Sequence, residues 1–148
     1  MNWQQVAWKL ITAWEGCKLH AYPDPATGGK PWTVGWGATG MDIGPNTVWT
    51  QVQADADLQK RIDKLGESID GYGVPLTCNQ KGALVSLAYN IGIGNLGTST
   101  LLKCLRRGDI AGSSSQFLVW NKVAGNVMQG LVNRRKSEKA IFDSPEAD

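Results

Sequence analysis

The sequence predicts a mainly helical α+β fold with one short β-hairpin sheet near its N-terminus. Several segments repeat apolar residues at helical spacing, and a capping signal precedes three of them. The segment 22–37 instead combines prolines and glycines with β-branched and aromatic residues, which is typical of a hairpin. A chain of 148 residues with 42% hydrophobic content suits a single domain, 1–148, with a substantial core.

The first predicted helix covers residues 2–15. Asn2 and Gln5 have the spacing of an N-terminal capping box, and Gly16 supplies a stop. The apolar stripe of this helix consists of Trp3, Val6, Ala7, Leu10, Ile11 and Trp14. Glu15 projects at the border of that stripe. Its carboxyl group therefore has an apolar flank, which suits a general acid.

The predicted hairpin follows this helix. Prolines keep residues 22–25 extended, Gly28 and Gly29 mark a turn, and residues 32–37 have the composition of a strand. Asp24 and Thr33 are therefore expected on facing arms, near the helix end that carries Glu15. Taken singly, Asp24 could merely stabilise a turn and Thr33 merely suit a strand.

The rest of the chain is predicted to be helical. Thr50 with Gln53 begins a long helix that reaches about residue 70, and Thr77 with Gln80 begins another. Shorter helices are expected over Ser99 to Arg107, Asp109 to Asn121 and Leu131 to Phe142. Three tryptophans on apolar helix faces are expected in the core: Trp3, Trp14 and Trp120.

Two carboxylates and a hydroxyl around one turn are suitable equipment for hydrolysing a glycosidic bond. One acid must protonate the departing oxygen, and a second group must position water or attack the anomeric carbon. Glu15 and Asp24 could fill these roles.

The same residues resemble the phage-type lysozymes, whose catalytic segment reads Glu-Gly-x-x-Leu-x-Ala-Tyr-x-Asp and then Thr-x-Gly-x-Gly. Here the two patterns cover Glu15 to Asp24 and Thr33 to Gly37. The resemblance continues at Gln80, Ala83, Leu84, Ser86 to Gly92, Ser99 to Leu102, Gly108, Asp109, Phe117, Trp120 and Gly130 to Glu138. It implies a lysozyme-like fold with a small lobe at about 15–55, a linking helix at about 50–70, and a helical lobe at about 75–148 joined by the helix at 2–15.

The resemblance implies an endolysin, a muramidase that hydrolyses the β-1,4 bond between N-acetylmuramic acid and N-acetylglucosamine in peptidoglycan and so lyses bacteria. Glu15 would be the general acid, and Asp24 with Thr33 would hold the attacking water on the opposite sugar face, as in an inverting hydrolase. Arg134 matches a family arginine that approaches and orients the catalytic glutamate. Arg135 is expected to point toward solvent or the helix surface.

Four further residues are candidates for substrate binding. Trp32 and Trp36 flank Thr33 and could either cover the sheet or line a saccharide cleft. Tyr89 and Asn90 match family positions at a helix end facing the cleft, where they would offer a stacking face and amide hydrogen bonds to an acetamido sugar. A buried Tyr89 with a bonded hydroxyl is the alternative.

The chain departs from the family pattern in two places. Loop 25–32 is longer than in many members, which affects the expected substrate contacts. Ala38 stands where many members have a histidine after Thr-x-Gly-x-Gly.

Composition excludes several other classes. A formal net charge of +2 with no nucleic-acid motif argues against nucleic acid as a partner. Three widely spaced cysteines, Cys17, Cys78 and Cys104, fit neither a disulfide framework nor a zinc site, so free thiols are expected. A regulatory thiol at Cys17 is a less favoured alternative. The resemblance implies no metal and no organic cofactor.

Location and partners follow from the N-terminus and the resemblance. Polar residues interrupt Met1 to Cys17, so neither a signal peptide nor stable membrane insertion is expected. The resemblance implies a monomer made in the host bacterial cytoplasm. It would reach its partner, the peptidoglycan glycan strand, through a lesion made by a holin.

Two other functions stay open. A lytic transglycosylase would cleave the same bond with Glu15 alone, so the presence of Asp24 and Thr33 favours hydrolysis. A noncatalytic peptidoglycan-binding module would not need Glu15.

Overall fold

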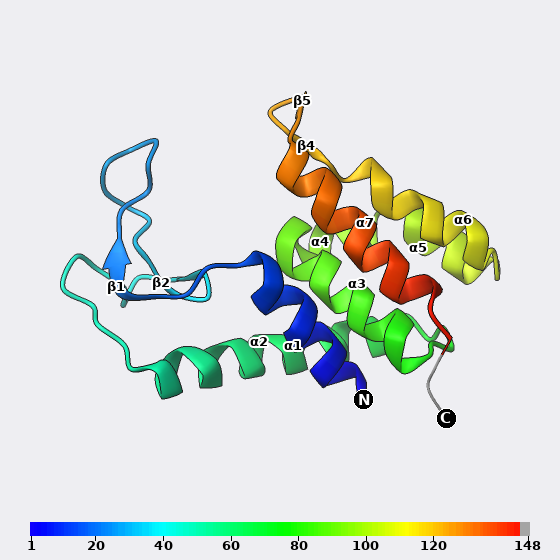
Figure 1. Ribbon diagram of the computed structural model, residues 1–148, viewed down its shortest axis with the longest axis horizontal. Helices are drawn as coiled ribbons and strands as arrows, with labels where there is room; N and C mark the ends of the chain where they lie inside the picture. The colour runs from blue at the N-terminus through cyan, green and yellow to red at the C-terminus, as the bar shows by residue number, and fades with distance from the viewer. Residues whose placement is uncertain (146–148) are drawn as a thin grey trace. The chain divides into compact units, whose positions relative to one another are not determined.

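The computed structural model describes residues 1–145 (Figure 1). The chain forms two bodies. Thr12–Arg61 make up the hairpin body, whereas Met1–Ile11 and the chain from Ile62 onward make up the helical body. Helices α1 (Trp3–Trp14) and α2 (Gln51–Asp70) each begin in one body and end in the other.

The hairpin body contains a three-stranded antiparallel sheet in the order β1 (Lys18–Tyr22), β2 (Thr33–Gly35) and β3 (Ala38–Thr39). Residues 47–49 run along the other edge of β1, where the amide of Trp49 donates to the carbonyl of Leu19 at 2.8 Å. A small apolar cluster supports the sheet and consists of Val34, Ala38 and Ile43, packed against Ala21, Trp32 and Trp49. The predicted hairpin is therefore confirmed.

Gly35 lies at a close approach between the sheet and helix α2. Its φ is +65°, a conformation that favours glycine, and an added Cβ would lie 2.9 Å from the Trp49 ring and 3.4 Å from the Cβ of Ala54. Both the backbone conformation and the space therefore require glycine at this position of the Thr-x-Gly-x-Gly pattern.

The helical body is built around helix α3 (Cys78–Ile91), whose middle is buried on all sides. Its other elements after α2 are α4 (Ile93–Gly97), α5 (Thr100–Arg106), α6 (Ile110–Gln116), the 3-10 helix η1 (Phe117–Val119), β4 (Lys122–Val123), β5 (Asn126–Val127) and α7 (Gln129–Asp143). Helix α3 packs along α7, and Figure 1 shows the two side by side. The rings of Phe117 and Phe142 meet at a centroid distance of 5.1 Å.

Two glycines let α1 pack closely within this body. The indole of Trp3 lies against Gly66 of α2, and Val6 lies against Gly82 of α3, so that a Cβ at either glycine would overlap the partner side chain. The ammonium of Lys81 stands 4.0 Å from the centroid of the Trp3 ring. The position of the start of α1 therefore depends on close packing against these two glycines as well as on apolar burial.

All three predicted capping boxes are present. In each box the backbone N–H of the capping residue donates to the side-chain oxygen of the glutamine, and the backbone N–H of the glutamine donates to the side-chain oxygen of the capping residue. The donor–acceptor distances are 2.8–3.1 Å. The boxes are Asn2 with Gln5, Thr50 with Gln53, and Thr77 with Gln80. These local signals therefore fixed three helix starts correctly.

Two expectations about the helical segments are wrong. The helix expected up to Asn121 ends at Gln116 and tightens into η1, and a hairpin of β4 and β5 follows it, turning through Ala124 and Gly125 at φ values of 50° and 82°. Trp14 is 39% exposed because it lies in the last turn of α1, beyond the residues that the helix buries. Within residues 1–145, no helix combines the length and apolarity needed to cross a membrane.

We predict that Gly35→Ala destabilises the protein more than Gly28→Ala does. Gly28 also has a positive φ, +71°, but has open space around an added Cβ. It therefore incurs only backbone strain, about 1–2 kcal/mol. Gly35→Ala adds overpacking against Trp49, worth about 1–3 kcal/mol more. Urea unfolding followed by circular dichroism measures the free energy of unfolding of both variants. Equal destabilisation would show that the Trp49 ring moves to accommodate a Cβ at Gly35.

Candidate active site

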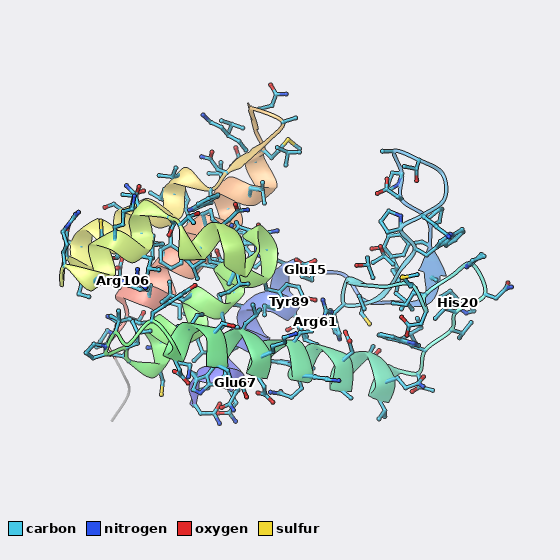
Figure 2. All side chains as sticks on the ribbon, turned by 180° about the vertical axis from the view of Figure 1, so that it is seen from behind. Glu15, His20, Arg61, Glu67, Tyr89 and Arg106 are labelled. Atoms are coloured by element: carbon cyan, nitrogen blue, oxygen red, sulfur yellow. The ribbon has the colours of Figure 1, made fainter. Side chains whose placement is uncertain are left out.

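Glu15 follows the last residue of α1 and precedes β1 by only Gly16 and Cys17. Its side chain is half-buried, and Figure 2 labels it where the ribbon of α1 ends. The capping box at Asn2 fixes the start of α1 and the buried face of the helix fixes its position, so the carboxyl group is carried at the end of a firmly held element.

The register of the hairpin places Asp24 and Thr33 on its two arms. Tyr22 is the strand partner of Thr33, and Asp24 lies two residues beyond Tyr22. Both side chains are half-buried. The hairpin thus carries a carboxylate and a hydroxyl on neighbouring arms, in the same body as Glu15.

The turn after β1 is internally hydrogen-bonded. The amide of Asp24 donates to the carbonyl of Gly29 at 2.9 Å, and the amide of Gly28 donates to the carbonyl of Asp24 at 2.8 Å. Oδ1 of Asp24 accepts from the amide of Ala26 at 2.7 Å. The hydroxyl of Thr27 donates to the carbonyl of Lys30 at 2.7 Å. The long loop therefore has a defined conformation, and one carboxylate oxygen of Asp24 is oriented by it.

The two tryptophans beside Thr33 have different surroundings. Trp32 packs against the apolar cluster of the sheet. Trp36 donates from its indole Nε1 to Oδ1 of Asp55 on α2 at 2.9 Å. Both rings are half-buried, so each covers part of the hairpin body and keeps an exposed portion.

Tyr89 and Asn90 lie in the last turn of α3, in the helical body. Tyr89 is half-buried and Asn90 is exposed. Gly92 ends the helix at a φ of +93°, with its amide donating to the carbonyl of Ala88 at 2.8 Å. The expected position of both residues at a helix end is therefore correct.

Arg134 belongs to a buried ionic cluster inside the helical body. Its Nε donates to Oε2 of Glu138 at 3.3 Å, and its Nη2 donates to the carbonyl of Ser86 at 3.3 Å. The hydroxyl of Ser86 donates to the same carboxylate oxygen at 2.5 Å. The side chain of Arg134 is only 5% exposed. The expected approach of Arg134 to Glu15 stays a prediction.

Arg135 does not point toward solvent, so that expectation is wrong. Its side chain is 0% exposed, and its Nε lies 2.7 Å from Oε1 of Glu138. Arg135 precedes Glu138 by three positions on α7, which puts the two groups on one buried side of the helix. The sequence shows this spacing, but not that this side faces the core.

Glu138 is the anion that both arginines share. Burial raises the pKa of this carboxyl group, whereas Arg135, Ser86 and Arg134 favour its ionised form. Since guanidinium groups keep their charge at every accessible pH, the carboxylate is the form that the cluster requires.

Among residues 1–145, no group of three or more His, Cys, Asp or Glu side chains is placed to hold a metal ion. Cys17 and Cys78 are half-buried and Cys104 is buried, and all three are free thiols.

Comparisons with known proteins show the family of the chain. The chain matches the phage lysozyme family over residues 12–138 and belongs to that family. It is 40% identical to the endolysin of Bacillus phage PZA over 148 residues, which cover 97% of this chain and 56% of that protein. It is 39% identical to the SAR-endolysin of Enterobacteria phage P21 over 111 residues, which cover 74% and 67% of the two chains.

The fold is also that of a solved relative. The endolysin from Escherichia coli O157:H7 phage FAHEc1 superposes with a TM-score of 0.82 at 32% identity, covering 100% of this chain and 98% of that one. The expected lysozyme-like α+β fold is therefore confirmed. The chain spans only about half the length of the Bacillus phage endolysins that it matches.

Three polar residues were not predicted from the sequence: Asp55 and Gln51 in the hairpin body, and Glu138 in the helical body. Asp55 and Gln51 share one face of α2. Asp55 contacts Trp36, 19 positions away in sequence, and Gln51 contacts Cys17, 34 positions away. Contacts between residues so far apart leave no local pattern in the sequence. Glu138 does have a local signal, its spacing of three and four from the two arginines.

We predict that Glu138→Gln destabilises the protein by about 3–5 kcal/mol at neutral pH, because it leaves two buried guanidiniums without their carboxylate. The matched control is Asp143→Asn on the same helix. The amide oxygen can still accept from the Ser114 hydroxyl, so the change removes only the ion pair with Lys139, in which the two side chains are 45% and 31% exposed. That change should cost about 0–1 kcal/mol. Urea unfolding measures both, and a loss at Glu138 no larger than the control would contradict the requirement for a carboxylate.

Proposed function

We propose that this chain is the catalytic part of an endolysin that degrades peptidoglycan. Its reaction would be hydrolysis of the β-1,4 bond between N-acetylmuramic acid and N-acetylglucosamine. The observation that carries this proposal is the position of Asp24, two residues beyond the strand partner of Thr33, in the body that also holds Glu15. Membership of the phage lysozyme family supports it.

In the proposed reaction, Glu15 protonates the departing glycosidic oxygen. Asp24 and Thr33 hold a water molecule on the opposite face of the sugar, where the carboxylate accepts a proton from that water as it attacks the anomeric carbon. The hydrogen bond from Ala26 to Asp24 supports this role, because it orients the carboxylate before substrate binds.

Arg134 is proposed to orient the Glu15 side chain. The planar guanidinium, held from two sides by Glu138 and the Ser86 carbonyl, has little freedom and is suited to such a task. Trp32, Trp36, Tyr89 and Asn90 are proposed to contact the glycan strand, the tryptophans through the exposed parts of their rings.

The same proposal covers the setting of the reaction. The enzyme would act as a monomer on the wall of the host bacterium, after synthesis in its cytoplasm and release through a holin lesion. Several relatives carry the name SAR-endolysin, so the release step is a separate proposal from the chemistry.

We predict that Glu15→Gln lowers the rate of clearing of purified sacculi by about 10²–10⁴-fold, because the amide keeps the shape of the side chain but cannot deliver a proton. The control is Glu67→Gln, which changes an exposed carboxylate on α2. It should keep the parent rate. A folded Glu15→Gln protein that clears sacculi at the parent rate would remove the central claim.

We also predict that hydrolysis inverts the anomeric configuration, because Asp24 and Thr33 activate water rather than form a sugar adduct. NMR of a defined oligosaccharide should then detect the α-anomer first, before mutarotation. Initial β-anomer would indicate retention. Products with anhydromuramic ends would instead indicate a lytic transglycosylase, and wall binding without any product would indicate a binding module.

A further inference from the structure

We propose that Asp55 is a positioning residue that holds the segments of Glu15 and Thr33 in one arrangement. The inference rests on the proposed function, since it takes Glu15 and Thr33 as reacting groups. Asp55 lies half-buried in the first half of α2, within the hairpin body. Asp55 acts through two neighbours, Trp36 and Gln51.

The first neighbour is Trp36, three residues after Thr33. Oδ1 of Asp55 accepts from the indole Nε1 of Trp36 at 2.9 Å. This bond joins the end of strand β2 to helix α2 across 19 positions of sequence. Because β2 is only three residues long, its direction depends on what holds its ends.

The second neighbour is Gln51, one turn earlier on α2. Its Nε2 donates to the same Oδ1 of Asp55 at 2.8 Å and lies 3.7 Å from the Sγ of Cys17. Cys17 is two residues after Glu15. Oδ1 of Asp55 therefore links two segments: the one that follows Thr33, through Trp36, and the one that follows Glu15, through Gln51 and Cys17.

The backbone at Trp36 has little rigidity of its own. Gly35 and Gly37 on its two sides have φ values of +65° and +100°, a region open to few other residues. A residue between two such glycines is oriented by its contacts rather than by local preference. The Asp55 bond fixes the indole of Trp36, and Nη2 of Arg61 donates to the Trp36 carbonyl at 3.4 Å.

Arg61 is itself fixed by the helix. Its guanidinium pairs with Asp57, with 2.9 Å between Nη2 and Oδ2, one turn back on α2. Figure 2 labels Arg61 on this helix. Trp36 is thus held at both its side chain and its backbone by groups from α2, and Asp55 provides the bond to the side chain.

A stacking role for Trp36 and a positioning role through Asp55 make different predictions. Trp36→Phe keeps an aromatic face for a sugar but removes the N–H. If stacking alone matters, Trp36→Phe should be nearly neutral. If the bond to Asp55 matters, Trp36→Phe should lower kcat as well, by no more than Asp55→Ala, which also removes the bond to Gln51.

The experiment compares Asp55→Ala, Asp55→Asn, Trp36→Phe and the double variant Asp55→Ala/Trp36→Phe by kcat and KM on a defined glycan oligosaccharide. Asp55→Ala should lower kcat by about 10–100-fold with little change in KM, since small misplacements of reacting groups cost rate. Asp55→Asn keeps an oxygen that accepts both hydrogen bonds, so it should stay within about 3-fold of the parent. The double variant should be no worse than Asp55→Ala alone, because Asp55→Ala already removes the bond to Trp36.

Glu67→Ala on the exposed face of α2 is the matched control and should stay within about 2-fold of the parent. Asp55→Ala with the parent kcat, Asp55→Asn as impaired as Asp55→Ala, or losses confined to KM would each overturn the inference. If Asp55→Ala does not fold, Trp36→Phe carries the test, and parent kcat in that variant overturns the inference. An inactive parent protein would instead overturn the proposed function, which the parent assay reveals separately.

Discussion

The attachment of the small sheet to helix α2 is the constraint on which the candidate site depends. A three-stranded sheet with a buried cluster of only Val34, Ala38 and Ile43 has little apolar area to hold it together. Close approach at Gly35 and hydrogen bonds to Trp36 compensate by joining the sheet to a long helix. The arrangement of the hairpin therefore depends on a few specific contacts, and so does the geometry of Asp24 and Thr33.

The helical body meets a different requirement, since it must bury charge as well as apolar side chains. Helix α7 buries three charged side chains on the side that contacts Ser86 of α3: Arg134, Arg135 and Glu138. Desolvating such a cluster is costly, so it contributes little to net stability compared with an apolar core of equal size. The cluster instead restricts the orientation of the Arg134 side chain. A guanidinium bonded at two points inside a packed core has few alternative orientations, which is useful to a residue proposed to position another.

Local signals in the sequence predicted a large part of the fold. Capping boxes and apolar stripes specified the starts of α1, α2 and α3 because both depend on residues within a few positions of each other. The hairpin of β4 and β5 was missed because its turn is Ala124-Gly125, without the Asn-Gly or Asp-Gly pair that usually marks a two-residue turn. Arg135 was misplaced because helical spacing alone does not tell which side of a polar helix faces the core.

The candidate site was predicted only in part, for a related physical reason. Glu15, Asp24 and Thr33 lie close along the chain and are joined by one helix end and one hairpin, so spacing alone grouped them. Asp55 reaches the site through the fold, and no pattern within its own helix distinguishes it from an ordinary solvated carboxylate.

The two interpretations of Asp24, turn stabiliser and catalytic base, are compatible. A carboxylate has two oxygens with about four acceptor positions, and the turn uses Oδ1 for the amide of Ala26. The bond that closes the turn fixes the plane of the carboxylate and so directs the remaining acceptor positions. A base held in this way needs no reorganisation when substrate arrives, which is the condition for effective electrostatic catalysis. The role proposed for Asp24 therefore depends on the first turn after β1 and its bond from Ala26, and not on the length of the loop up to Thr33.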